Sequence, residues 1–74
     1  MFLLWFDDSK RPTAQKIAAA IARYTERYGH APSVVLTCPG ECEDVPGVEV
    51  RAAEHVRQFN YWVGMVENTQ GVYQ

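Results

Sequence analysis

The side chains best suited to chemistry follow the first apolar run of the sequence. Two adjacent carboxylates, Asp7 and Asp8, come directly after Phe2–Phe6. Paired carboxylates can hold Mg²⁺, while basic side chains and the free N–H groups of a helix start can grip a phosphate. Asp7 and Asp8 are therefore candidate catalytic residues of a magnesium-dependent phosphate-handling or nucleotide-binding protein. Its candidate phosphate-binding residues are Ser9, Lys10, Arg11 and Thr13.

A structural role for the same segment is the competing interpretation. Asp7 would end the strand, Asp8 would favour the positive end of the helix dipole, and Lys10 and Arg11 would be solvated. No third carboxylate and no histidine stands nearby in the sequence. Two aspartates without such a partner favour the structural role.

Two cysteines and one histidine form an incomplete zinc pattern. Cys38, Cys42 and His55 match three of the four ligand spacings of a two-Cys, two-His finger. No histidine occupies positions 59–61, where the fourth ligand belongs. A zinc-stabilised adaptor that uses these three residues is a further hypothesis, with two free thiols or a disulfide as its alternatives.

Aromatic side chains gather near the end of the chain. Residues 60–62, with Trp5, could stack bases or sugars, but only Arg51 and Arg57 supply positive charge near them. Large aromatics more often pack in cores and interfaces. We therefore interpret them as candidate interface residues: Trp5, Tyr61 and Trp62.

Composition narrows the class of protein. The 74 residues carry a formal net charge of −2, which gives no general attraction to nucleic acid or to an acidic membrane. We expect no basic leader and no membrane-spanning stretch, and hence a cytoplasmic protein with reduced cysteines. We expect no cofactor, with Mg²⁺ and Zn²⁺ as the alternatives discussed above.

One helix is strongly patterned, from Thr13 to Tyr28. One face carries the apolar side chains, and Lys16 falls on the far side. The residues of this apolar face are Ile17, Ala20, Ile21, Tyr24 and Tyr28. Thr13 is the expected N-cap, after Pro12, and Gly29 the expected left-handed C-cap.

The other elements are strands. Phe2–Phe6 is apolar throughout, residues 33–37 and 48–51 predict two more strands, and residues 59–66 a last one. Residues 52–58 fit a helical turn or a loop.

These elements predict a single domain over residues 1–66, with a polar tail over residues 67–74. It is an α/β or α+β fold in the order β-α-β-β-β, with one main helix on one face of a mixed four-stranded sheet.

The leading functional hypothesis rests on apolar sheet surface that the single predicted helix cannot bury. The first strand, which we place near the middle of the sheet, is apolar on both faces, but a single helix covers only one. We therefore expect a non-enzymatic interaction module. Its uncovered sheet face would bind a second copy of the chain or another protein.

Overall fold

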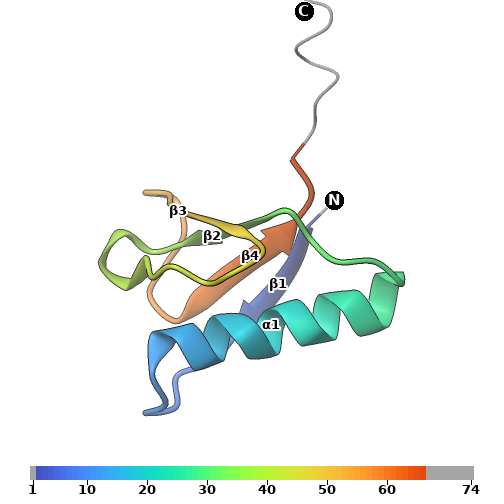
Figure 1. Ribbon diagram of the computed structural model, residues 1–74. Coiled ribbons are helices and arrows are strands. Elements are labelled where there is room, and N and C mark those ends of the chain that lie inside the picture. Colours follow the sequence, from blue (N-terminus) through green and yellow to red (C-terminus); the bar gives the residue numbers. More distant parts are fainter. Residues whose placement is uncertain (1, 67–74) are drawn as a thin grey trace, which may run out of the picture.

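The computed structural model describes residues 2–66, so the predicted polar tail over 67–74 lies outside it. It contains one main helix and one four-stranded mixed sheet, which confirms the predicted fold (Figure 1). In chain order the elements are β1 (Phe2–Phe6), α1 (Thr13–Tyr28), β2 (Val34–Thr37), the short 3-10 helix η1 (Pro39–Glu41), β3 (Glu49–Ala52) and β4 (Asn60–Gly64). Within these residues, no helix has the length and apolarity needed to cross a membrane.

The strand order in the sheet is β1-β4-β2-β3. β4 runs antiparallel to both of its neighbours, whereas β2 and β3 are parallel. The expectation that the first strand lies near the middle is wrong, because β4 occupies that place and β1 forms an edge. β3 is the other edge, as its alternating sequence predicts.

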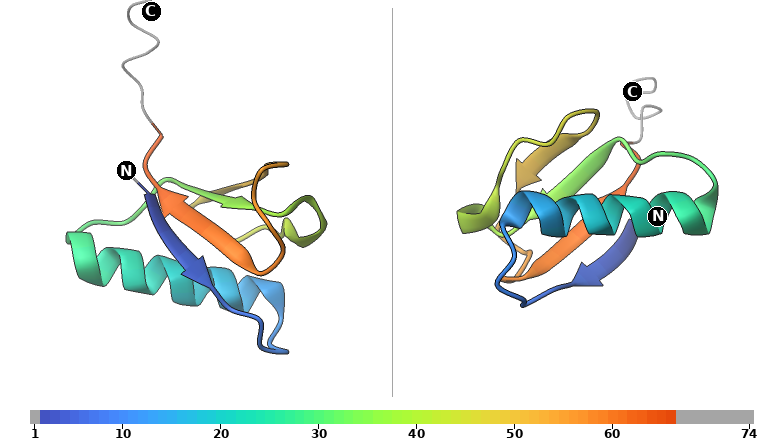
Figure 2. Two further views of the ribbon diagram at one scale, coloured as in Figure 1. Left: turned by 180° about the vertical axis from the view of Figure 1, so that it is seen from behind. Right: turned by 60° about the horizontal axis from the view of Figure 1, so that its bottom comes forward.

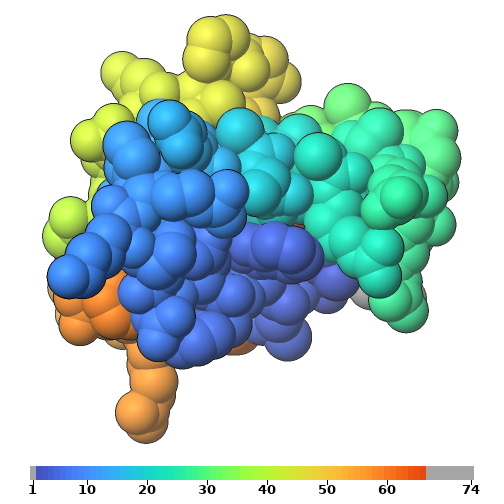
Figure 3. Space-filling view, turned by 90° about the horizontal axis from the view of Figure 1, so that it is seen from below, coloured from blue at the N-terminus to red at the C-terminus, as the bar shows by residue number. Residues whose placement is uncertain are grey.

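The helix covers one face of this sheet, as Figure 2 shows from two sides. Ile17, Ala20 and Tyr24 are buried against Val35 and Val63 from the two central strands. In the space-filling view of Figure 3, α1 lies across this face, and atoms of β1 remain visible along one side of the helix. The predicted apolar face of the helix is therefore confirmed.

Lys16 departs from its predicted position on the far side of the helix. It is only 4% exposed, and its Nζ lies 4.7 Å from the centre of the Phe59 ring. Lys16 stands one turn before Ala20, at the border of the apolar face. Its long aliphatic stem can therefore cover apolar surface while the ammonium group lies against an aromatic ring.

The helix ends are formed by backbone geometry. Pro12, and not Thr13, occupies the N-cap position, and no side chain caps the helix there. Proline fixes a φ of −58° that suits the entry into a helix. Gly29 closes the other end with a φ of 79°, as predicted, and its N–H donates to the carbonyl of Thr25.

Residues 53–59 form turns and no helix, which decides between the two alternatives for this segment. They connect β3 to β4 and therefore pass the end of β2. His55 packs edge-on against Trp62, at 4.8 Å between ring centres. The connection thus covers part of the sheet face that α1 leaves open.

Candidate functional site

The turn after β1 is closed by its own side chains. The Ser9 N–H donates to Asp7 Oδ1 at 2.9 Å, and the Arg11 guanidinium donates to Asp7 Oδ2 at 2.6 Å. The Ser9 amide, and then the Ser9 hydroxyl and Arg11, lower the pKa of Asp7 from 3.8 to about 2. Asp7 is therefore a carboxylate held by three groups of its own turn, and this arrangement matches the structural interpretation of the segment.

The other candidates for phosphate binding do not converge with it. Asp8 and Lys10 are exposed and make no ion pair or side-chain hydrogen bond among residues 2–66. Thr13 is the first residue of α1. Arg11, the strongest anion ligand of the group, is occupied by Asp7. The predicted magnesium and phosphate residues are thus neighbours without a shared, open centre.

The cysteines and His55 lie apart. Cys38 and Cys42 are free thiols, the Cys42 thiol contacts the carbonyl of Val50, and His55 lies on Trp62 at the open face. Across residues 2–66, no group of three or more His, Cys, Asp or Glu side chains has a geometry that could hold a metal ion. The three predicted zinc ligands are therefore not brought together.

A half-buried polar contact that the sequence does not indicate joins η1 to the start of β4. Glu41 accepts hydrogen bonds from the Phe59 N–H at 2.8 Å and from the Tyr61 hydroxyl at 3.1 Å. Phe59 has a φ of 69°, in the left-handed region that non-glycine residues seldom adopt. The Glu41 bond to its N–H stabilises this conformation, and Lys16 covers its ring. Nothing local in the proline-glycine loop indicates that Glu41 has a partner 18 residues later.

The predicted interface residues divide between the two faces of the sheet. Adjacent strand residues point to opposite sides, so Tyr61 and Trp62 cannot share a face. Tyr61 is fully buried under α1, and its register partner Trp5 packs against the same core. Only Trp62 belongs to the open face. The open-face residues of β1 are Phe2, Leu4 and Phe6.

Two of these three side chains, Leu4 and Phe6, are the most exposed large apolar groups in the described part of the chain. Leu4 and Phe6 are each 61% exposed. Leu4 stands opposite Trp62 in the register, and the Phe2 ring lies 6.5 Å from that of Trp62. The sequence indicated that β1 has more apolar surface than one helix can cover. The uncovered residues are the alternate residues of β1 that point to the open face of the sheet.

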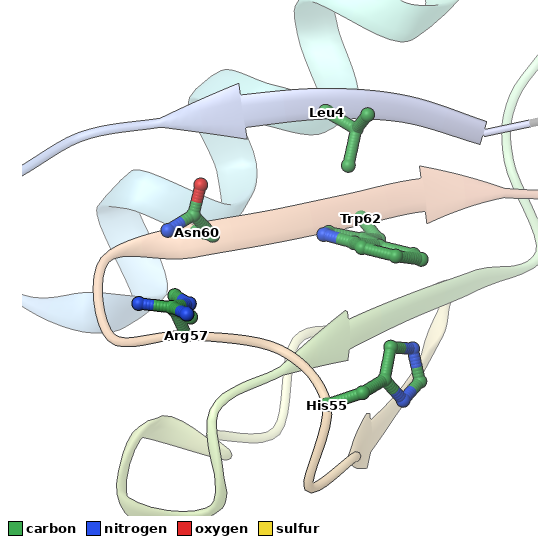
Figure 4. Close-up of a pocket in the computed structure, with 5 residues that line it drawn as sticks. All are labelled: Leu4, His55, Arg57, Asn60 and Trp62. Atoms are coloured by element: carbon green, nitrogen blue, oxygen red, sulfur yellow. The ribbon is translucent and has the colours of Figure 1, made fainter.

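An open pocket of about 310 Å³ lies on the same face. Figure 4 shows the side chains around it: Leu4 from β1, Asn60 and Trp62 from β4, and His55 and Arg57 from the connection between β3 and β4. The pocket is thus lined jointly by β1, β4 and the connection between β3 and β4.

The outer edge of β1 is also unpaired. The Asp7 N–H donates to the Phe59 carbonyl, so the backbone groups of residues 7, 5 and 3 point toward β4. The N–H and C=O groups of Leu4 and Phe6 therefore point away from the sheet. No strand of the described residues lies on that side.

Comparison of the chain with protein families, with curated proteins and with solved structures yields no match.

Proposed function

We propose that the protein is a non-enzymatic interaction module that pairs with a second copy of itself through the outer edge of β1. The observation that carries the proposal is the coincidence of two features in Leu4 and Phe6. Both side chains are 61% exposed, and the backbone groups of both point outward from the sheet. One incoming strand would therefore satisfy the hydrogen bonds and cover apolar surface at the same time.

The occupant is a second β1 strand because this edge is complementary to itself. Phe2–Phe6 contains no charge, no proline and no glycine. Edge strands of monomeric proteins usually carry such residues, which prevent pairing between copies. Two antiparallel β1 strands would form an isologous contact and join two four-stranded sheets into one. We place the protein in the cytoplasm, where its free thiols remain reduced.

Sedimentation equilibrium at micromolar concentration should give the mass of two chains. The double substitution Leu4→Lys with Phe6→Lys should give the mass of one chain, because like charges would then face each other across the pair. Met65→Lys is the matched control, since Met65 is 43% exposed but lies outside β1. A wild-type chain that stays monomeric at about 100 µM, a concentration that populates dimers with a Kd of about 100 µM or lower, would overturn the proposal.

Leu4→Pro separates edge pairing from stacking of the two open faces. Proline removes the outward N–H of Leu4 and spares the bonds between β1 and β4. Edge pairing predicts loss of the dimer with an unchanged circular dichroism spectrum. A Leu4→Pro dimer as tight as the wild type would contradict pairing through this edge.

A further inference from the structure

We propose that the open pocket at Trp62 binds a small aromatic anion, with its ring against Trp62 and its phosphate or carboxylate on Arg57. The pocket lies on the face of the sheet, whereas the proposed dimer contact lies at its outer edge. Leu4 belongs to both sites, because an incoming strand would cover part of its side chain. The inference does not depend on the dimer, because Trp62 and Arg57, which carry it, lie outside β1.

Arg57 supplies the charge. Of the four other arginines of the described chain, Arg27 lies over the ring of Tyr28 and the remaining three are paired with carboxylates. These ion pairs are Arg11 with Asp7, Arg23 with Glu26, and Arg51 with Glu49. Arg57 makes no such pair and no side-chain hydrogen bond within residues 2–66, although its side chain lines the pocket. A free guanidinium beside a pocket favours a carboxylate or a phosphate, because two oxygens of either group can accept parallel hydrogen bonds from it.

Trp62 and its neighbours supply a surface for a ring. The half-buried indole lies between Leu4 and His55, and His55 meets it edge-on at 74° between ring planes. Flat aromatic ligands stack on such a surface whatever their exact substituents. Leu4 adds an aliphatic wall that is 61% exposed.

Asn60 adds a polar group between the ring and the charge. Its Nδ2 donates to the carbonyl of Gln58, and its Oδ1 has no partner in the described residues. Oδ1 can therefore accept a hydrogen bond from an amino or hydroxyl group of a ligand. Because Asn60 and Trp62 are two residues apart on one strand face, their Cα atoms lie about 7 Å apart.

The size of the pocket limits the ligand. Its volume, about 310 Å³, lies at the small end of the usual range for binding sites. It accommodates a ligand about as large as one mononucleotide and not a longer chain. Suitable probes are AMP and phenyl phosphate as ring-bearing anions, adenosine as a ring without a charge, and ribose 5-phosphate as an anion without an aromatic ring.

Isothermal titration of the wild-type protein tests the pocket. We expect AMP to bind at least about ten-fold more tightly than adenosine and than ribose 5-phosphate, since it engages both Trp62 and Arg57. Arg57→Gln should remove the advantage over adenosine. The matched control is Arg51→Gln, which deletes an exposed arginine that is already paired with Glu49 and does not line the pocket.

Three results would overturn the inference. The first is binding of neither AMP nor phenyl phosphate at about 10 mM, the weakest range of specific binding. The second is equal affinity for AMP and ribose 5-phosphate, which would exclude the ring contact. The third is an equal loss in Arg57→Gln and Arg51→Gln, which would indicate a general charge effect. Arg57 is exposed, so its substitution leaves the fold intact.

Discussion

Asp7 is the residue whose chemistry its neighbours change most clearly. Its pKa is lowered from 3.8 to about 2 by the Ser9 amide first, then by the Ser9 hydroxyl and Arg11. We therefore expect its carboxyl carbon to titrate near pH 2 in an NMR experiment. Because the folded state holds fewer protons, Asp7 stabilises the fold above pH 3.8, and this contribution is lost as the pH falls toward 2.

Substitution of Arg11 tests the order of these causes. Arg11→Ala should raise the pKa of Asp7 only part of the way, because the Ser9 amide still donates to it. Arg23→Ala, which removes an exposed arginine paired elsewhere, should leave the titration unchanged. An Asp7 that titrates at its usual pKa in the wild-type protein would show that the turn is open in solution.

Tyr61 should make the protein sensitive to alkaline conditions. Burial, and then the charge of Glu41 beside the hydroxyl, raise the pKa of Tyr61 above its ordinary value of 10.0. The unfolded chain loses this proton as the pH rises past 10, while the folded chain keeps it. The free energy of unfolding should therefore be unaffected by Tyr61 below pH 10 and fall above it.

Urea unfolding between pH 8 and 11 measures this effect. Tyr61→Phe should flatten the alkaline decline, because it removes the hydroxyl that donates to Glu41. The same decline in the wild type and in Tyr61→Phe would mean that other groups cause the alkaline loss.

At the scale of elements, the helix and the sheet meet through the residues that the sequence identified. Ile17 is fully buried at the centre of this contact. Ile17→Ala should lower the free energy of unfolding by about 2–5 kcal/mol, because it leaves a cavity between α1 and the central strands. Chemical denaturation followed by circular dichroism measures this change.

Arg23→Ala is the control on the opposite side of the same helix. Arg23 is exposed and pairs only with exposed Glu26, so its loss should cost well under about 1 kcal/mol. Ile21→Ala should fall between the two, since Ile21 is half-buried. Equal costs at Ile17 and Arg23 would mean that α1 packs through another face.

Periodicity explains which elements could be predicted and which could not. The bounds of β1 and α1 agree with the sequence, because an unbroken apolar run and a helical repeat are local patterns. The contact of Glu41 with Phe59 and Tyr61 is not local, and neither is the position of Lys16 against Phe59. The face assignment of Trp5 and Tyr61 was in principle available, since adjacent strand residues alternate.

Strand order is the main feature of the whole molecule that the sequence left open. β1 is apolar enough to be central, and only the insertion of β4 between β1 and β2 makes it an edge. The apolar composition of a strand indicates how strongly it favours burial. It does not indicate which neighbouring strand buries it. The apolar composition of β1 correctly indicated that some apolar surface stays exposed. In the structure this surface belongs to Leu4 and Phe6.

The central position of β4 has a consequence for synthesis on the ribosome. The strand that joins β1 to β2 is the last one translated, 58 residues after β1 begins. At ordinary rates of translation, β1 waits on the order of 3–12 s for its only neighbour in the described sheet. During that interval the nascent chain presents an uncharged, fully unpaired apolar segment, which is the kind of sequence that chaperones bind.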